Sequence, residues 1–294
     1  MKLHYFQSPN FGDALSPLLV AKLSGEKVEW ADAYDADVVG VGSVLYTGHW
    51  LYRESVYGRT PKGFLSYLRE KVKVRRAPIK IWGSGFLEEP KDAAPVLRLR
   101  KAEVKAVRGK ETLRILKKLG FVKEETGIAF GDPGILYSTL LETMPKKEHT
   151  LGLIPHYMDK DAGARLAVEL KAKGVKVNLI DVMNPDPIET VRQIAMCETI
   201  LSSSLHGCIV SDGMGIPNHQ VSFSTLGFDK KTYLLKYRDY YSALDMELPE
   251  VWCAADCGVA DLSEKIKVAY RVAPAKVEEV KSGLVKVFPR LWEK

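Results

Sequence analysis

The stretch SSSLHG, residues 202–207, brings three serines and a histidine to the expected start of a helix. The apolar run TIL precedes it and predicts a buried strand that ends at Ser202. His206 then falls in the first helical turn, where unpaired N–H groups and the helix dipole attract anions and favour a neutral imidazole. A bound anion would oppose that effect, so His206 is a candidate general acid. The alternative is a packed histidine that bonds to backbone.

Arg108 stands in the segment VRGKET, between a predicted strand and a predicted helix. A guanidinium at such a junction can hold a carboxylate or phosphate through two parallel hydrogen bonds. The alternative is a surface arginine in a region rich in basic residues. Basic side chains also stand among tyrosines in segment 228–244, which includes Lys231 and Lys236. That segment is either a basic rim over a cleft or a solvated helix face.

Three turns with small or polar residues follow predicted strands. Asn10, Gly12 and Asp13 form the first turn and predict a cap for the helix after it, although turn chemistry alone also explains these residue types. The glycine-rich turns at 40–45 and 83–86 would let backbone approach a ligand closely. The turn at 40–45 is not a dinucleotide fingerprint, because it lacks the third glycine and a ribose-binding acid.

The composition fits a globular cytoplasmic protein without a metal site. Of the 294 residues, 46% are hydrophobic and 27% are charged, and no apolar run is long enough to span a bilayer. The amino-terminal segment has no apolar core typical of a signal peptide. The four cysteines show no paired spacing of the kind that binds zinc, and the pair in CAADC is separated by three residues.

The net charge of +6 comes largely from two basic stretches, residues 69–80 and 98–110. Solvated faces beside strands explain them most simply. The alternatives are a surface that meets anionic lipid headgroups or one that steers an anionic substrate. Nucleic acid is not expected as a partner, because aromatic residues are not interleaved with the basic ones.

Short apolar strands alternate with helical stretches along the chain, which predicts α/β architecture with parallel sheets. The expected strands include 36–45, 78–86 and 103–109, and the polar segment 142–150 is a plausible linker before the alternation restarts. Two such runs predict two Rossmann-like domains that face each other across a cleft. We place the first at 1–145 and the second at 146–270, with a carboxy-terminal helix in 271–294 that packs back on the first domain.

Taken in order, NFGD, GSG, VRG, GDPG (131–134) and SSSLHG resemble the polysaccharide pyruvyl transferase family, over about residues 5–245. The resemblance implies a glycosyltransferase-B-like arrangement with the active site in the cleft. It also implies transfer of pyruvate from phosphoenolpyruvate, a co-substrate, onto a sugar as a cyclic ketal. No metal or other cofactor is required, because cationic side chains can neutralise the phosphate.

The resemblance and the motifs together assign roles to particular side chains. His206 delivers a proton or stabilises the leaving phosphate, and Asp13 accepts a proton from the attacking hydroxyl. The remaining site residues divide into a donor-binding set (Arg108, Ser203, Ser204, Lys231 and Lys236) and an acceptor-binding set (Asn10, Gly83 and Ser84).

Two other functions stay open at this stage. A nucleotide-sugar-dependent glycosyltransferase would share the architecture but would bind a uridine or guanosine diphosphate sugar. A non-catalytic subunit of a polysaccharide-assembly complex would share the fold with a degenerate site. The acceptor can be free, nucleotide-linked or lipid-linked, and a lipid-linked acceptor would give the basic stretches a use in peripheral contact at the inner membrane face.

Overall fold

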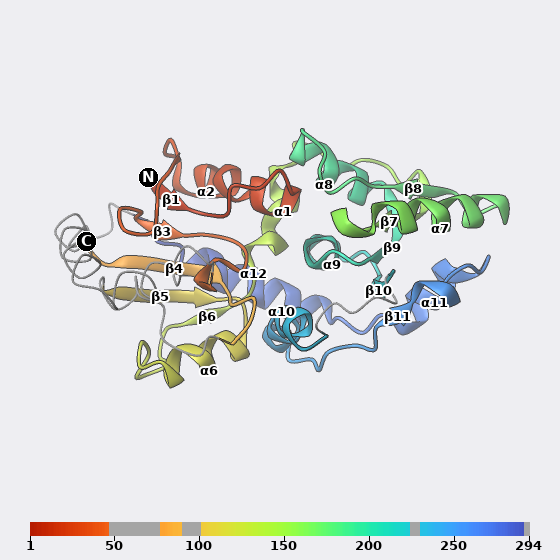
Figure 1. Ribbon diagram of the computed structural model, residues 1–294. Coiled ribbons are helices and arrows are strands. Elements are labelled where there is room, and N and C mark those ends of the chain that lie inside the picture. The colour runs from red at the N-terminus through yellow and green to blue at the C-terminus, as the bar shows by residue number, and fades with distance from the viewer. Residues whose placement is uncertain (47–76, 90–100, 224–229, 291–294) are drawn as a thin grey trace, which may run out of the picture.

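The computed structural model describes residues 1–46, 77–89, 101–223 and 230–290 of the chain. Within these ranges it contains two parallel β-sheets, which lie side by side and are flanked by helices (Figure 1). The α/β class and the parallel sheets predicted from the alternating pattern are therefore confirmed.

The first sheet comes from the first half of the chain and has the order β2-β1-β3-β4-β5-β6, with every pair parallel. Its central strands are apolar because helices and loops cover both faces, as in β4, where Ile79, Ile81 and Trp82 are fully buried. The strands are β1 (Lys2–His4), β2 (Glu29–Trp30), β3 (Val38–Val39), β4 (Ile79–Ser84), β5 (Ala102–Val107) and β6 (Ala129–Phe130).

The second sheet comes from the second half and has the order β11-β10-β9-β7-β8, again with every pair parallel. The polar segment predicted as a linker lies between the two sheets as a loop that ends where β7 begins. The strands are β7 (His149–Ile154), β8 (Val177–Leu179), β9 (Cys197–Ser202), β10 (Asn218–Ser222) and β11 (Trp252–Cys253).

The helices begin and end at the residues that local chemistry favours. In α8, Asp186 accepts from two backbone N–H groups at the start and proline is the first helical residue. Gly120 follows α6 in a left-handed conformation (φ 80°), as expected for a helix stop. The α-helices are α1 (Phe11–Ala14), α2 (Ser16–Ser24), α6 (Lys110–Lys118), α7 (Lys160–Ala172), α8 (Pro187–Ala195), α9 (Leu205–Gly213), α10 (Lys230–Ala243), α11 (Leu262–Ala269) and α12 (Pro274–Lys286). Among the described residues, no helix combines the length and apolar character needed to cross a membrane.

Four 3-10 helices complete the described elements. They are η1 (Val44–Tyr46), η2 (Pro133–Leu140), η3 (Tyr157–Asp159) and η4 (Ala254–Asp256). The element η2 matters most for the site, because it follows β6 directly and packs against α9, α2 and α12.

The strand predicted over residues 36–45 is much shorter in the structure. β3 contains only Val38 and Val39, and the chain then turns away from the sheet. Gly42 has a positive φ of 103°, and the N–H of Val41 donates to Ser16 Oγ (3.3 Å) rather than to a neighbouring strand. The apolar residues after β3 are buried by loop packing, which an apolar pattern alone does not distinguish from a strand.

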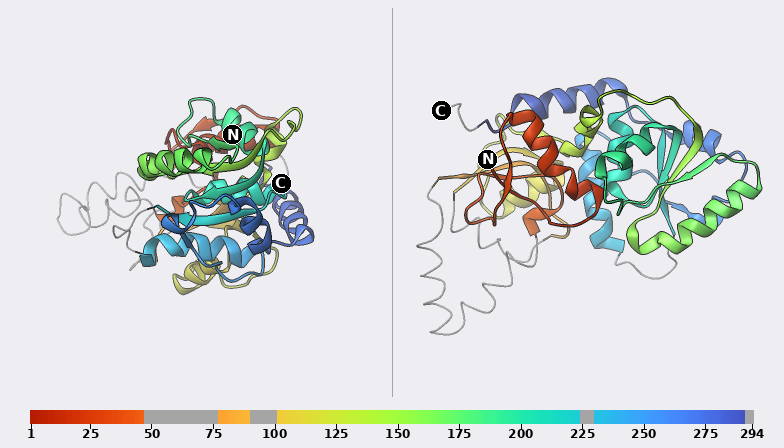
Figure 2. Two further views of the ribbon diagram at one scale, coloured as in Figure 1. Left: turned by 90° about the vertical axis from the view of Figure 1, so that its right-hand side faces the viewer. Right: turned by 90° about the horizontal axis from the view of Figure 1, so that it is seen from above.

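The final helix, α12, lies against the first sheet although it follows the second in sequence (Figures 1 and 2). The indole N–H of Trp82 on β4 donates to the backbone oxygen of Leu284 (3.0 Å), and the Phe288 ring meets the Trp82 ring edge-on at 4.9 Å. After β6, Gly131 leaves room for the helix, because an added Cβ would lie 2.5 Å from Val280. The chain therefore returns from the second sheet to the first.

Replacing Leu284 by alanine tests how much this return stabilises the fold. Leu284 is fully buried, so Leu284→Ala should lower the free energy of unfolding by ~2–5 kcal/mol through lost burial and a cavity. Its neighbour Val285 is 40% exposed, and Val285→Ala should cost less than about 1 kcal/mol. Urea unfolding of both variants measures the difference. Equal losses would show that α12 is only loosely attached.

Candidate functional site

In each sheet the strand order reverses at one point. The loops that leave the two sheets at these points lie against each other. The reversal lies between β1 and β3 in the first sheet and between β7 and β9 in the second. Ligands of parallel sheets bind at the carboxyl ends of the strands beside such a reversal. The loops after β1 and β9 place Gly12 against His206, since a Cβ added at Gly12 would lie 1.9 Å from His206 Nδ1. We call the surrounding group the central site: Asp13, Arg108, Asp132, His206 and Lys236.

The predicted helix start next to His206 is confirmed, and the serines before it form hydrogen bonds within the turn. Helix α9 begins at Leu205, so His206 lies in its first turn. Ser204 holds the N-cap position, yet its side chain makes no capping hydrogen bond within the described structure. Instead, Ser202 Oγ accepts from the Ser204 N–H (3.0 Å), and its single proton is within reach of the Ile154 carbonyl (3.1 Å) and the Ser204 carbonyl (2.9 Å). The serines therefore shape the turn that presents the imidazole.

The His206 side chain is 14% exposed and stands between the rings of Phe11 and Tyr137, at 6.3 and 6.5 Å. Burial first, and then the positive charges of Lys236 and Arg108, lower its pKa to about 3. The imidazole is therefore neutral at pH 7. Its buried Nε2 has no hydrogen-bond partner among the described residues and lies 3.9 Å from Asp132 Oδ1. Such an unused nitrogen is available to a ligand.

Asp132 is fully buried and follows β6 as the cap of η2. Its Oδ1 accepts from the Gly134 N–H (2.9 Å), whereas Oδ2 has no partner in the described part of the chain. Burial raises the pKa of this carboxyl group to about 6, against the opposing effect of Arg108. Asp132 and His206 thus form an incompletely bonded pair that can share one proton.

Asp13, predicted as a base, lies in α1 and faces the loop after β3. Its Oδ1 is 3.1 Å from the Cβ position of Gly42, a glycine whose positive φ excludes most side chains there. Burial and the neighbouring charge of Asp132 raise the pKa of Asp13 to about 7, while Lys236 opposes the rise. The carboxyl group can therefore gain or lose a proton near neutral pH.

Lys236 comes from α10 and supplies an ammonium group to the central site. Burial and the charge of Arg108 lower its pKa to about 8, and Asp13 opposes that shift. The amine is still largely protonated at pH 7. Of the two lysines predicted to bind the donor, only Lys236 can be placed, because the Lys231 side chain lies outside the described residues.

Arg108 is buried at 1% exposure, in contrast to the surface alternative considered from the sequence. Its Nε donates to Asp239 Oδ2 (3.0 Å), NH1 donates to Ser43 Oγ (2.8 Å) and NH2 donates to the Phe86 carbonyl (2.5 Å). Each guanidinium nitrogen thus has a protein acceptor. Direct binding of a substrate anion by Arg108 stays a prediction. Its positive charge nevertheless affects the pKa values of His206, Asp132 and Lys236.

The serines predicted to bind the donor lie in a loop of the second sheet, where both are buried. Ser203 Oγ donates to Asp159 Oδ2 (2.7 Å) and accepts from the His156 N–H (2.8 Å), which joins the loops after β7 and β9. Ser204 is 3% exposed beside it. A contact of either side chain with a donor remains a prediction.

The residues predicted on the acceptor side surround the same edge of the first sheet. Asn10 Oδ1 accepts from the Gly12 N–H (3.1 Å) and caps α1, which confirms a cap in this turn, but the helix begins at Phe11 rather than near Ala14, so Gly12 and Asp13 lie within it. Ser84 is buried and donates to the Gly42 carbonyl (2.9 Å). Gly83 has a positive φ of 75° and lies against Pro133. These three residues shape the backbone around Asp13, and acceptor binding by them is untested.

Sequence reasoning missed Asp132, Asp239 and Tyr137 as site residues. Asp132 had a readable signal, because it stands in GDPG directly after a strand. Tyr137 Oη donates to the Gly12 carbonyl (2.6 Å) and fixes the loop against His206, but nothing in its local sequence indicates this contact. In the described ranges, no three histidine, cysteine or acidic side chains are grouped so that they could hold a metal ion.

Comparison with known proteins identifies two matches. A model of the family described as polysaccharide pyruvyl transferase matches residues 7–221. An uncharacterized protein of Acanthamoeba polyphaga mimivirus is 30% identical over 250 residues, which cover 83% of this chain and 75% of the relative. The matched region includes Asp13, Arg108, Asp132 and His206.

Removing the carboxylate of Asp13 should change how stability depends on pH. The pKa of about 7, against 3.8 for an ordinary aspartate, means that the native state binds more protons than the unfolded state between about pH 4 and 7. Its contribution to stability therefore falls as the pH rises through that window. The stability of Asp13→Asn relative to the wild type should increase from about pH 5 to about pH 8 in urea unfolding. The exposed Asp256→Asn is the control, and an equal pH trend in both variants would contradict the assignment.

Proposed function

The chain belongs to the polysaccharide pyruvyl transferase family, and from this membership we propose that it moves pyruvate from phosphoenolpyruvate onto a sugar, forming a cyclic ketal. The observation that carries the proposal is the set of acids and bases gathered in the central site. The pKa values of Asp132, Asp13 and Lys236 are about 6, 7 and 8, around a neutral His206. Groups tuned toward neutral pH in this way are typical of proton-transfer sites.

The donor brings additional negative charge to the cations of the central site. Phosphoenolpyruvate carries a carboxylate and a phosphate, and Lys236 is the cation best placed to bind one of them. Arg108 supports that binding through its field while it stays paired with Asp239. Because Lys236 and Arg108 depress the pKa of His206, an anion that offsets their charge raises this pKa. Donor binding therefore favours the imidazolium form that a general acid requires.

The transfer has two stages, and in each of them one proton is delivered and one is removed. A proton adds to the methylene carbon of the donor, C2 becomes electrophilic, and a sugar hydroxyl forms a C–O bond to C2 while losing its proton. The bond between C2 and the phosphate oxygen then breaks. A second hydroxyl of the sugar attacks C2, and its proton leaves with inorganic phosphate. We assign delivery of the first proton to His206, whose Nε2 faces Asp132 as a proton reserve, and removal of the hydroxyl proton to Asp13.

In this proposal, the two halves of the chain bind different substrates. Residues 1–145 form the acceptor side with Asp13, and residues 146–270 form the donor side with His206 and Lys236. The arrangement would be glycosyltransferase-B-like, with the central site in the cleft. The carrier of the acceptor sugar, and any contact with a membrane surface, are left as predictions from the sequence.

Donor binding is the first prediction of this proposal. The full chain should bind phosphoenolpyruvate in titration calorimetry, and Lys236→Met should weaken binding at least tenfold because a cation of the central site is lost. Lys267→Met, on the exposed face of α11, is the matched control. Arg108→Ala is a poor probe, since it leaves Asp239 buried without its cation and endangers the fold. Binding of a uridine or guanosine diphosphate sugar in place of phosphoenolpyruvate would favour the glycosyltransferase alternative.

Loss of the imidazole should affect turnover more than donor affinity. In an assay of phosphate release from phosphoenolpyruvate with a panel of saccharide acceptors, His206→Gln should lower kcat by a factor of roughly 10²–10⁴, the usual contribution of a general acid. His149→Gln, at the opposite end of β7, should keep the wild-type rate. A near-normal kcat in His206→Gln would remove His206 from the proton-transfer role.

A further inference from the structure

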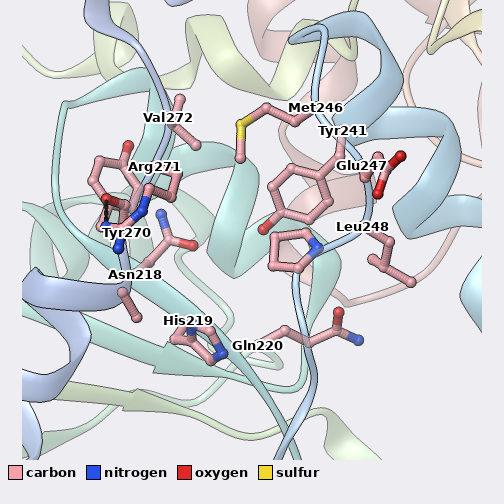
Figure 3. Close-up of a pocket in the computed structure, with 12 residues that line it drawn as sticks. Asn218, His219, Gln220, Tyr241, Met246, Glu247, Leu248, Tyr270, Arg271 and Val272 are labelled. Atoms are coloured by element: carbon pink, nitrogen blue, oxygen red, sulfur yellow. Dashed lines mark hydrogen bonds between the residues drawn. The ribbon is translucent and has the colours of Figure 1, made fainter.

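A second hollow, outside the central site, lies between β10 and the segments that lead to β11 and α12 (Figure 3). Its volume is about 300 Å³, at the small end of the range of roughly 300–1,000 Å³ for ligand pockets. We call it the β10 pocket. Its lining joins two amides and a pair of opposite charges with aromatic and apolar side chains: Asn218, Gln220, Glu247, Arg271, Tyr241, Met246, Tyr270 and Val272.

Asn218 presents an unused acceptor to the β10 pocket. The residue is 4% exposed, and its Nδ2 donates to Asp212 Oδ1 (2.6 Å) and to the Ile216 carbonyl (3.2 Å). Because both acceptors need the NH₂ group, the amide orientation is fixed, and Oδ1 is the atom left over. Oδ1 is buried and has no hydrogen-bond partner within the described residues.

Gln220 repeats this feature two residues further along the same strand. It is 1% exposed, and its buried Oε1 also has no partner in the described structure. Residues two apart on a strand share one face, with their Cα atoms about 6–7 Å apart. Two acceptors that need donors are thus set apart along one wall. A buried carbonyl oxygen without a hydrogen-bond partner costs free energy. A molecule that donates hydrogen bonds to this wall would therefore be favoured.

The wall is held rigid from behind by Asp212. Its carboxylate accepts from Asn218, from Tyr240 Oη (2.8 Å) and from Tyr270 Oη (3.0 Å). These bonds join β10, α9, α10 and the segment before α12. Since Tyr270 donates its only hydroxyl proton to Asp212, its oxygen can only accept further bonds. Tyr270 therefore adds acceptor capacity beside Asn218.

The chemistry of this lining selects a neutral ligand with several hydroxyl groups. The unpartnered oxygens of Asn218 and Gln220 accept hydrogen bonds, so they suit hydroxyl groups better than the oxygens of a phosphate or carboxylate. On the same lining, the negative charge of Glu247 opposes the positive charge of Arg271. Separated acceptors also suit donors spread around a ring better than donors gathered on one edge, as in a nucleobase. The Met246, Val272 and Tyr241 side chains can cover the C–H face of such a ring. A pyranose has both features, with hydroxyls around its rim and apolar C–H faces.

We propose that the β10 pocket binds a sugar unit. The binding does not depend on phosphoenolpyruvate. That the sugar is a non-reacting unit of the acceptor rests on the proposed function. Asp212 stands six residues after His206 on α9, a rise of about 9 Å along the helix, so both sites are held by one short element.

Saturation-transfer NMR on the full chain tests the proposal without any donor present. The probes are methyl glycosides of glucose, galactose and mannose at millimolar concentration, with adenosine and uridine as competitors. Gln220→Met removes the acceptor while keeping the side-chain volume, and it breaks no protein hydrogen bond of Oε1. Its melting temperature should therefore be unchanged or higher. Gln193→Met, on α8 away from the pocket, is the matched control.

The expected result is that at least one glycoside binds the wild type and Gln193→Met, and binds Gln220→Met at least tenfold more weakly. A bulky second variant, Val272→Phe, should also reduce binding by filling the pocket. If none of the glycosides bound, the proposal would be overturned, and the pocket would hold water. Binding that neither variant changes, or displacement by a nucleoside alone, would overturn it too. Phosphate release is measured separately, so its failure would count only against the transferase proposal.

Discussion

The buried ion pair between Arg108 and Asp239 holds the rest of the site in place. The two residues are 131 positions apart, and the pair joins the carboxyl end of β5 to α10. Asp239 also accepts from the backbone and hydroxyl of Thr112 (2.8 and 2.6 Å), so the carboxylate is bonded at both oxygens. A buried pair is stable only when its remaining hydrogen bonds are made, and here they are. Lys236 lies one helical turn before Asp239, so the same pair positions the site's ammonium group.

The charge of Arg108 reaches further than its contacts. It opposes the rise of the Asp132 pKa and lowers the pKa of Lys236 and His206. Burial acts on all of these groups, raising the pKa of acids and lowering that of bases. The two effects leave acids and bases that differ little in proton affinity, around a neutral histidine. Such a balance is sensitive to one added anion, which is the property that a site for an anionic donor needs.

Much of this arrangement could be predicted from local sequence, and the remainder depends on distant contacts. The alternation of strands and helices, the start of α9 at Leu205 and the cap at Asn10 follow from periodicity and capping chemistry. The burial of Arg108 did not, because its partner comes from a helix in the other half of the chain. The shortness of β3 was also missed, since loop packing and strand pairing bury the same apolar residues. The orphaned atoms of Asp132 and His206 emerge only when two sheets meet.

The return of α12 to the first sheet has a mechanical consequence. Among the described residues, the loop before β7 leads from the first sheet to the second and the segment before α12 leads back, and α12 packs on η2, which precedes β7. The two halves also share one hydrophobic core, in which Leu3 and Phe11 are grouped with Ile154 and Ile200. Tyr270, Arg271 and Val272 stand in the segment that leads back to the first sheet, and they also line the β10 pocket. A molecule bound there would tie this segment to β10 and so resist separation of the two sheets.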